Sequence, residues 1–328
     1  MDVLQMKKIL LILLAFVAAF AVSEIIVTKI VKYPKRTSSV KYVFLPDFAG
    51  FETLKLKEPH SKFWSVEGGN RVFEYNNLSV TGSDMYPDDK SKLIYVLGDS
   101  YVEASSVPAE QTGVSVFQSA LNKIDTNLKV FNGSFPNSDP FTLWFRTMFF
   151  EKWYRPEYVI LLVTHLDLLD MNMQRHPDTL NFTVPENFGS VIPESKSERY
   201  LDVFRKRFAV FNLISTSISA AGAKGDRFRN GLDEVYTKNL AASIPKFREC
   251  LLKYKNKFGE KFIVVSLEVN EEKNKVIYDA CAELGINYAN KKLLTPENQW
   301  AKGQHLNAKG NKEFGEFLYD TFIRFYKK

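Results

Sequence analysis

The chain has 328 residues, a net charge of +6 and two cysteines. This length suits one large domain with an appended region, and two cysteines exclude a disulfide-rich scaffold. The positive charge favours anionic surfaces such as a membrane or an acidic glycan. Because lysines and arginines are scattered and no nucleic-acid motif occurs, nucleic acid is not an expected partner.

Residues 1–32 are predicted to be a transmembrane anchor or a signal. Residues 9–22 are apolar and uncharged and follow two lysines. Continued to Val31, the stretch reaches the roughly 20 residues that a spanning helix needs. It also has the form of a secretory signal, with cleavage sites after Ala21 and Ser23.

The rest of the chain is predicted to be an α/β domain behind a cover region. Residues 33–90 are rich in aromatic and turn residues and predict irregular structure that contains strands. In residues 91–328, strands alternate with helices, which predicts a parallel sheet wound by right-handed crossovers. We expect strands at about 93–97, 128–132, 157–163 and 261–268, and helices at 109–123, 139–153, 234–256, 272–284 and 308–326.

Residues 172–232 interrupt this alternation and are predicted to be an insertion. They contain three prolines and the basic amphipathic piece YLDVFRKRFAVFNLI. The insertion is either a lid or partner surface, or a helix packed over the edge of the sheet.

The two cysteines, Cys250 and Cys281, lie in helical segments separated by a strand. In an exported protein they could pair, but lone buried thiols are also common. No CxxC motif or histidine cluster indicates a metal site.

A serine follows the first apolar strand directly, in Gly98-Asp99-Ser100. At the carboxyl end of a parallel strand and before a helix, a serine is well placed for nucleophilic attack. The free N–H groups of the helix can stabilise an oxyanion there. The alternative is an ordinary turn, with Gly98 for the bend and Asp99 or Ser100 as the helix N-cap.

A histidine lies near the far end of the chain, in the segment GQHLNAKG at residues 303–310. The serine needs a base, and histidine has the pKa suited to that task near neutrality. In an open α/β sheet, a serine at a strand end and a loop histidine before the last helix, here His305, can meet outside the carboxyl ends of the strands.

The segments YVLGDSYVEASSV and GQHLNAKGNKEF resemble the SGNH (GDSL-type) hydrolases, particularly their membrane-anchored bacterial branch. The resemblance covers about residues 90–170 and 255–325 and implies a flavodoxin-like three-layer fold with a parallel sheet. It implies that Ser100 is the nucleophile and His305 the base, without a cofactor. The backbone N–H groups of Ser100 and Gly133 would form the oxyanion hole.

The third block of the family departs from its pattern in this chain. Leu166 stands where the family has an asparagine that completes the oxyanion hole, and leucine cannot donate a hydrogen bond. His165 could replace it by a local shift, and Asp167 is a further site candidate in the same block.

The last block departs as well, because Lys302 stands where the family has the aspartate that orients the histidine. A lysine cannot accept the imidazole N–H, and its charge disfavours the imidazolium. A backbone carbonyl or Glu297 could orient His305 instead.

These residues predict an acyl-ester hydrolase or an acyl (acetyl) transferase. The resemblance implies a cell-envelope carbohydrate as substrate and a membrane acyltransferase as a candidate partner. The alternative is an inactive SGNH-fold protein that serves glycan binding or envelope assembly. Four basic residues at 29–36 outnumber Lys7 and Lys8, which would keep the domain in the cytoplasm. The signal-like leader and the resemblance favour an anchored domain in the periplasm or at the cell surface.

Overall fold

The computed structural model describes twelve stretches of the chain, which include most of the α/β domain. They are residues 3–31, 40–44, 53–57, 59–65, 71–78, 80–86, 90–136, 138–170, 203–205, 207–222, 225–300 and 305–326.

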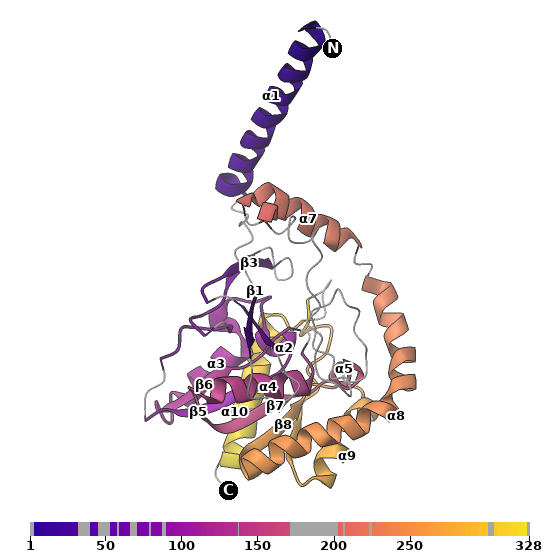
Figure 1. Ribbon diagram of the computed structural model, residues 1–328. Coiled ribbons are helices and arrows are strands. Elements are labelled where there is room, and N and C mark those ends of the chain that lie inside the picture. Colours follow the sequence, from indigo (N-terminus) through magenta and orange to yellow (C-terminus); the bar gives the residue numbers. More distant parts are fainter. Residues whose placement is uncertain are drawn as a thin grey trace.

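A five-stranded parallel sheet forms the centre of the molecule (Figure 1). Its spatial order is β6-β5-β7-β8-β9. Relative to chain order this is 2-1-3-4-5, the flavodoxin-like order, so the predicted fold class is confirmed. The strands are β5 (Lys92–Leu97), β6 (Leu128–Asn132), β7 (Pro156–Leu162), β8 (Phe262–Ser266) and β9 (Asn287–Asn290).

Helices cover both faces of the sheet, and alternate residues of β5 point to opposite layers. Ile94 and Val96 pack in the cluster that contains α3 (Gly113–Leu121) and α10 (Ala308–Tyr326). Leu93, Tyr95 and Leu97 pack in the other cluster. That cluster contains α4 (Pro140–Glu151), α8 (Gly225–Phe258) and α9 (Glu271–Glu283).

α8 begins at Gly225, earlier than the expected start at 234 and inside the predicted insertion. The other helices and strands follow the sequence pattern more closely, with β9 as an exception. Its sequence, Asn-Tyr-Ala-Asn, is short and lacks an apolar run, so no strand was predicted there. It pairs with β8 from Ile263↔Asn287 to Ser266↔Asn290. β9 is an edge strand, so it pairs with a neighbouring strand on one side only. This explains why its sequence can be this polar.

The cover region contains two antiparallel hairpins. They are formed by β1 (Val40–Phe44) with β2 (Thr53–Lys57) and by β3 (Lys62–Ser65) with β4 (Arg71–Glu74). Tyr75, directly after β4, is buried and donates a hydrogen bond to Glu103 of α2 (Ser100–Glu103) at 2.7 Å. This part of the cover region is therefore attached to the α/β core.

The N-terminal segment is a long helix, α1 (Val3–Ile25), continued by a π-helical turn over Ile26–Ile30. Within the described part of the chain it is the one helix long and apolar enough to cross a membrane, over Gln5–Ile30. Most of its apolar side chains are exposed, whereas Phe20 is half-buried and Val27 is buried.

The insertion does not pack over the sheet edge where it is described. Its helix α7 (Ala209–Gly222) contacts α1 and the π-helical turn (Figure 1). The sequence-based alternative of an edge-covering helix is therefore wrong for this piece. Residues 171–202, which hold the three prolines, lie outside the described residues.

Both cysteines are free and buried, so the disulfide alternative is not realised. Cys250 belongs to α8 and Cys281 to α9. Burial raises the pKa of Cys250 well above its ordinary value and raises the pKa of Cys281 to about 12. Since the thiolate is the reactive form, both side chains should be inert in the folded protein.

We predict that a chromogenic disulfide reagent titrates no thiol in the native chain over minutes and two thiols per chain after unfolding without reductant. The physical reason is the burial and the raised pKa of both thiols. Absorbance of the released chromophore measures both steps. Rapid reaction of the folded protein would contradict this prediction, as would the absence of thiols after unfolding.

Candidate active site

Ser100 lies where β5 ends and α2 begins. A Cβ atom on Gly98 would stand 2.4 Å from Cγ2 of Val102, so the turn at this point requires glycine. Asp99 is the N-cap of α2 and accepts the N–H of Tyr101 at 3.0 Å. Asp99 therefore shapes the turn, as the capping alternative predicted, and Ser100 occupies the first helical position.

The structure brings Ser100 and His305 together. The serine Oγ and the histidine Nε2 are 2.8 Å apart, although 205 residues separate them in the chain. The Tyr101 ring lies beside the imidazole, with ring centroids 5.8 Å apart. Both side chains are half-buried. At this distance Nε2 can accept the hydroxyl proton, which requires the neutral imidazole to carry its proton on Nδ1.

The histidine loop is held by the side chains that follow it. Asn307 caps α10 by accepting the Gly310 N–H at 2.9 Å. The buried Asn311 amide donates to the carbonyl oxygen of Leu306 at 2.9 Å and accepts the N–H of Gly113 at 3.1 Å. Asn311 thus connects the loop to the first turn of α3, and sequence reasoning missed it because Gly113 is 198 residues away.

Gly310 allows the loop and α10 to approach each other closely. A Cβ atom there would lie 2.3 Å from the backbone oxygen of Asn298, which must then move. Asn298 itself accepts the N–H of Asn307 at 2.8 Å. The position of His305 therefore depends on a glycine five residues later.

Gly133 does not offer its N–H to an oxyanion in this structure. That N–H donates to the carbonyl oxygen of Val96 at 2.9 Å and continues the pairing of β6 with β5. The next two amides are also bonded, Ser134 to the Asn132 side chain at 3.2 Å and Phe135 to the Gly98 carbonyl at 3.1 Å. The sequence-based assignment of Gly133 to the oxyanion hole is therefore not supported.

His165 and Asp167 lie at the carboxyl end of β7, the strand beside β5, in α5 (His165–Asp170). The Asp167 carboxylate accepts the N–H and the hydroxyl of Thr164, at 2.6 and 3.0 Å, and so closes the turn after the strand. His165 contacts Glu268 through its backbone N–H at 2.8 Å and its Nδ1 at 2.5 Å.

Glu268, the partner of His165, is a residue that sequence reasoning missed. It is buried and follows β8 by two residues. Its carboxylate fixes the tautomer of His165 with the proton on Nδ1, in the way that a carboxylate orients a catalytic imidazole. The strand-end position of Glu268 was the available signal.

The acid that would orient His305 is not Glu297. The Glu297 side chain is 69% exposed and pairs with Lys309, with 3.3 Å between the carboxylate and the ammonium. Lys302 lies outside the described residues, so the effect of its charge stays a prediction.

A buried polar cluster includes Glu103, the last residue of α2. Glu103, Tyr75 and Arg146 are all buried. Burial, followed by the charge of Glu103, raises the pKa of Tyr75 well above its ordinary value. Burial also lowers the pKa of Arg146 to about 10, while the charge of Glu103 acts in the opposite direction. The guanidinium lies over the Phe135 ring, 4.7 Å from its centroid, and so braces the loop that follows β6.

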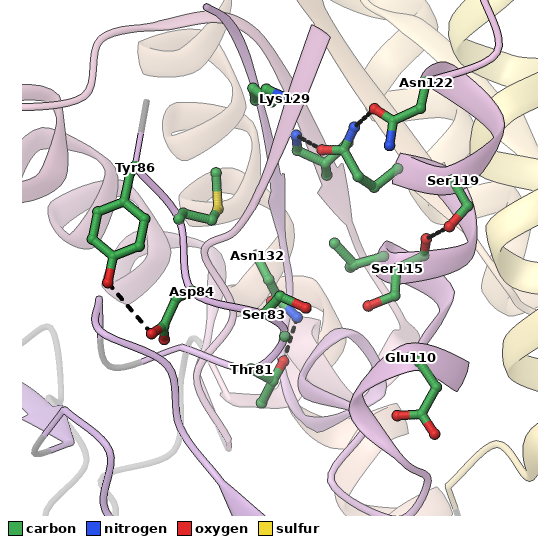
Figure 2. A pocket seen from close by; sticks show the side chains of 15 residues that line it. Thr81, Ser83, Asp84, Tyr86, Glu110, Ser115, Ser119, Asn122, Lys129 and Asn132 are labelled. Atoms are coloured by element: carbon green, nitrogen blue, oxygen red, sulfur yellow. Dashed lines mark hydrogen bonds between the residues drawn. The ribbon is translucent and has the colours of Figure 1, made fainter. Parts of the chain in front are cut away.

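A pocket of about 490 Å³ lies between residues 81–86, β6 and α3 (Figure 2). It is lined neither by Ser100 nor by His305. Asn132 connects the two places, because it lines the pocket and donates to the carbonyl oxygen of Val102 in α2 at 3.1 Å. The lining is rich in hydroxyl, amide and carboxylate groups and includes Ser83, Asp84, Tyr86, Glu110, Gln118 and Asn122.

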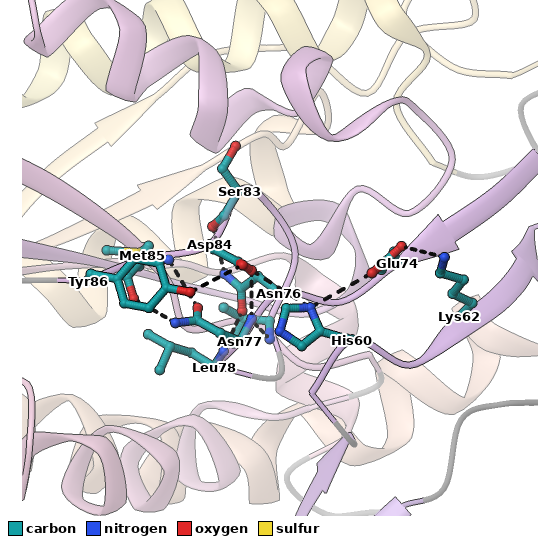
Figure 3. Close-up of polar contacts among 11 residues, drawn as sticks. His60, Lys62, Glu74, Asn76, Asn77, Leu78, Ser83, Asp84, Met85 and Tyr86 are labelled. Atoms are coloured by element: carbon teal, nitrogen blue, oxygen red, sulfur yellow. Dashed lines mark hydrogen bonds and ion pairs between the residues drawn. The ribbon is translucent and has the colours of Figure 1, made fainter.

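Asn76 and Asn77 form hydrogen bonds with residues 83–85, which line this pocket (Figure 3). Asn77 accepts the Met85 N–H at 3.0 Å and donates to the Met85 carbonyl at 2.8 Å. Asn76 donates to the Ser83 carbonyl at 3.0 Å. Asp84 accepts the Asn77 N–H at 2.9 Å. The wall that carries the exposed Tyr86 ring is therefore held in a defined shape.

The described ranges contain no group of three or more His, Cys, Asp and Glu side chains that could hold a metal ion. The chemistry that the arrangement can perform is that of the serine–histidine pair.

Solved structures of esterases are among those similar to this chain. A psychrotrophic esterase, EstA, from Pseudoalteromonas sp. matches with a TM-score of 0.42 and 11% identity, over 73% of this chain and 100% of that one. A lipase/acylhydrolase from Enterococcus faecalis matches at 0.41 and 13%, over 70% and 95%. Est24, a carbohydrate acetylesterase from Sinorhizobium meliloti, matches at 0.39 and 11%, over 71% and 99%.

At these identities and TM-scores the likeness is too distant to transfer an activity to this chain. No protein-family model matches the sequence, and no relative is found among curated proteins.

We predict that Gly310→Ala destabilises the protein by about 1–3 kcal/mol, the usual range for overpacking, because the added methyl group meets the Asn298 carbonyl oxygen. Chemical denaturation of both proteins measures the difference. Lys309→Ala is the matched control, since it removes only exposed ion pairs one residue earlier. Equal stability of the Gly310 variant and the unsubstituted protein would show that the loop relaxes without cost.

Proposed function

We propose that the protein is a serine acyl-ester hydrolase or acyltransferase that acts on a cell-envelope carbohydrate. The observation that supports this function is the 2.8 Å contact between Ser100 Oγ and His305 Nε2 at the carboxyl edge of the sheet. This is where open α/β folds bind their ligands.

In the proposed reaction, His305 accepts the hydroxyl proton as Ser100 attacks the ester carbonyl carbon. The tetrahedral intermediate collapses, and His305 returns the proton to the leaving alcohol. An acyl group then remains on Ser100. Water in a hydrolase, or a sugar hydroxyl in a transferase, then attacks the acyl carbon while His305 accepts its proton. His305 returns this proton to Ser100 Oγ as the bond between Oγ and the acyl group breaks, and the acid or the new ester leaves.

The oxyanion would be stabilised by the N–H of Ser100. Ser100 is the first residue of α2, so its N–H has no acceptor within the helix. With the Gly133 amide paired to Val96 and leucine at position 166, the two other family donors are missing. Loss of one such donor costs about 10²–10³ in turnover. Slow turnover on simple esters is therefore expected.

A carbohydrate substrate is favoured by the resemblance to the anchored SGNH branch and by the polar pocket that Asn132 lines. Hydroxyl, amide and carboxylate side chains around an exposed tyrosine can bind sugar hydroxyls. The pocket would hold sugar units on one side of the acylated position, with Asn132 between the pocket and α2.

We predict that a fluorophosphonate probe labels the intact protein and that Ser100→Ala abolishes the labelling. His305→Asn should lower hydrolysis of a short-chain aryl ester by about 10²–10⁴-fold, because it removes the base. Mass spectrometry of the labelled peptide and the initial rates are the measurements.

Two matched variants serve as controls for this experiment. Ser105→Ala removes another partly exposed hydroxyl in the turn after α2. His60→Asn removes another histidine and keeps a residue type that tolerates the left-handed backbone at φ 57°. Labelling that survives in the Ser100 variant would move the chemistry elsewhere, and an intact protein that neither labels nor hydrolyses would favour a binding function.

We further propose that the domain lies outside the cytoplasm and receives acyl groups through a membrane acyltransferase. A reporter that is active only outside the cytoplasm, fused after Lys328, should be active. Its matched control carries the same reporter without residues 1–32. Activity of a cytoplasm-only reporter in place of the exported one would instead support the orientation that the basic residues at 29–36 favour.

A further inference from the structure

The membrane helix and the insertion meet at a specific joint. Glu24, the one acidic residue of α1, directs its carboxylate at the first residues of α7. One oxygen accepts the N–H of Ala209 and the other accepts the N–H of Val210, both at 3.0 Å. The first N–H groups of a helix have no partner within that helix. Glu24 satisfies two of them from about 185 residues away.

Apolar contacts flank this cap on both sides. Phe20 packs edge-on against Phe208, with ring centroids 5.2 Å apart, and lies 6.2 Å from the Phe211 ring. On the other side Val27 is buried against Ala209 and its neighbours. The segment from Phe20 to Val27 is therefore part of a packed joint. A leader that was removed after Ala21 would take Phe20 with it.

The length of α1 places this joint at a membrane boundary. Glu24 lies sixteen positions after Lys8 in the helix, which is a rise of about 24 Å at roughly 1.5 Å per residue. The side chains of Lys7 and Lys8 add to this length, so that their ammonium groups can reach the aqueous boundary of a hydrocarbon layer about 30 Å thick. A carboxylate is costly within that layer, so Glu24 belongs at its opposite boundary.

The insertion exposes apolar side chains near this joint, and basic residues precede α7 in the sequence. Phe211 and Ile214 of α7 are 36% and 52% exposed, and Val203, shortly before α7, is 58% exposed. The segment Arg205-Lys206-Arg207 lies between them in the sequence. Exposed apolar side chains next to basic residues are the composition of helices that lie in the boundary layer of a membrane with anionic lipids.

We propose that α7 is an interfacial helix, which lies in the headgroup layer of the same membrane that α1 crosses. The α1–α7 joint is retained in the mature protein, so α1 is an anchor and is not removed as a signal. Figure 1 shows α7 across the end of α1, on the side of the sheet where α2 begins at Ser100. The carboxyl edge of the sheet therefore faces the membrane.

Spin labels on the full chain in vesicles of phosphatidylcholine and phosphatidylglycerol test this arrangement. Nitroxides are attached at Val203→Cys and Ile214→Cys, and at Tyr278→Cys as the water-exposed control on α9. The two native thiols are buried, and labelling of the unsubstituted chain measures their background. We expect dissolved oxygen to accelerate the relaxation of the nitroxides at residues 203 and 214. A water-soluble nickel complex should accelerate the relaxation of the nitroxide at residue 278. Water-like behaviour at all three positions would overturn the proposal.

A second pair of measurements examines the joint itself. Glu24→Leu removes both acceptors, so the label at residue 214 should shift towards the water-like pattern. Glu24→Gln keeps one acceptor oxygen and should shift it less. An unchanged label in the leucine variant would count against the cap. The intact mass of protein purified from membranes should include residues 1–23, and a mass that lacks them would overturn the retained joint whatever the labels report.

Discussion

The side chain of Asn311 holds together the two ends of the α/β domain. Its amide donates to the loop of His305, and its oxygen accepts the first N–H of α3, almost two hundred residues earlier. α3 packs against α10, and both lie in the apolar cluster that covers β5, the strand that precedes Ser100. The contact between Ser100 and His305 is therefore set by a buried amide, by the glycine at 310 and by the packing of two helices.

The sequence predicted the central part of the fold because its signals are local and strong. The apolar runs at 93–97 and 157–163 can hardly be anything but buried strands, and both are strands in the sheet. The polar edge strand at 287–290 has no such run, since only its backbone pairing defines it. The packing of α7 could not be predicted from the sequence either, because its partners Phe20 and Glu24 lie near the N-terminus, far from α7 in the chain.

Some residues of the candidate site could likewise be predicted from the sequence, and others could not. Residue type and order sufficed to place Ser100 beside His305, because few other residues can supply the chemistry. Gly133 was assigned by its position in a short motif, but the direction of its N–H follows from the register of β6 against β5. Glu297 was close in sequence to His305, yet its side chain points to Lys309. The direction of a backbone N–H and the rotamer of a side chain depend on tertiary structure, so a short sequence motif does not specify them.

With α7 in the headgroup layer, as proposed, the joint between α1 and α7 would change how the serine encounters its substrate. A domain on a flexible tether samples a volume, and its effective concentration falls as the tether lengthens. A domain fixed at the bilayer by two crossed helices samples a thin layer and diffuses with the lipids. The encounter frequency then depends on the number of acylated groups per area of membrane and hardly at all on their bulk concentration. Such a protein would favour substrates that are themselves held at the surface over those that drift past it.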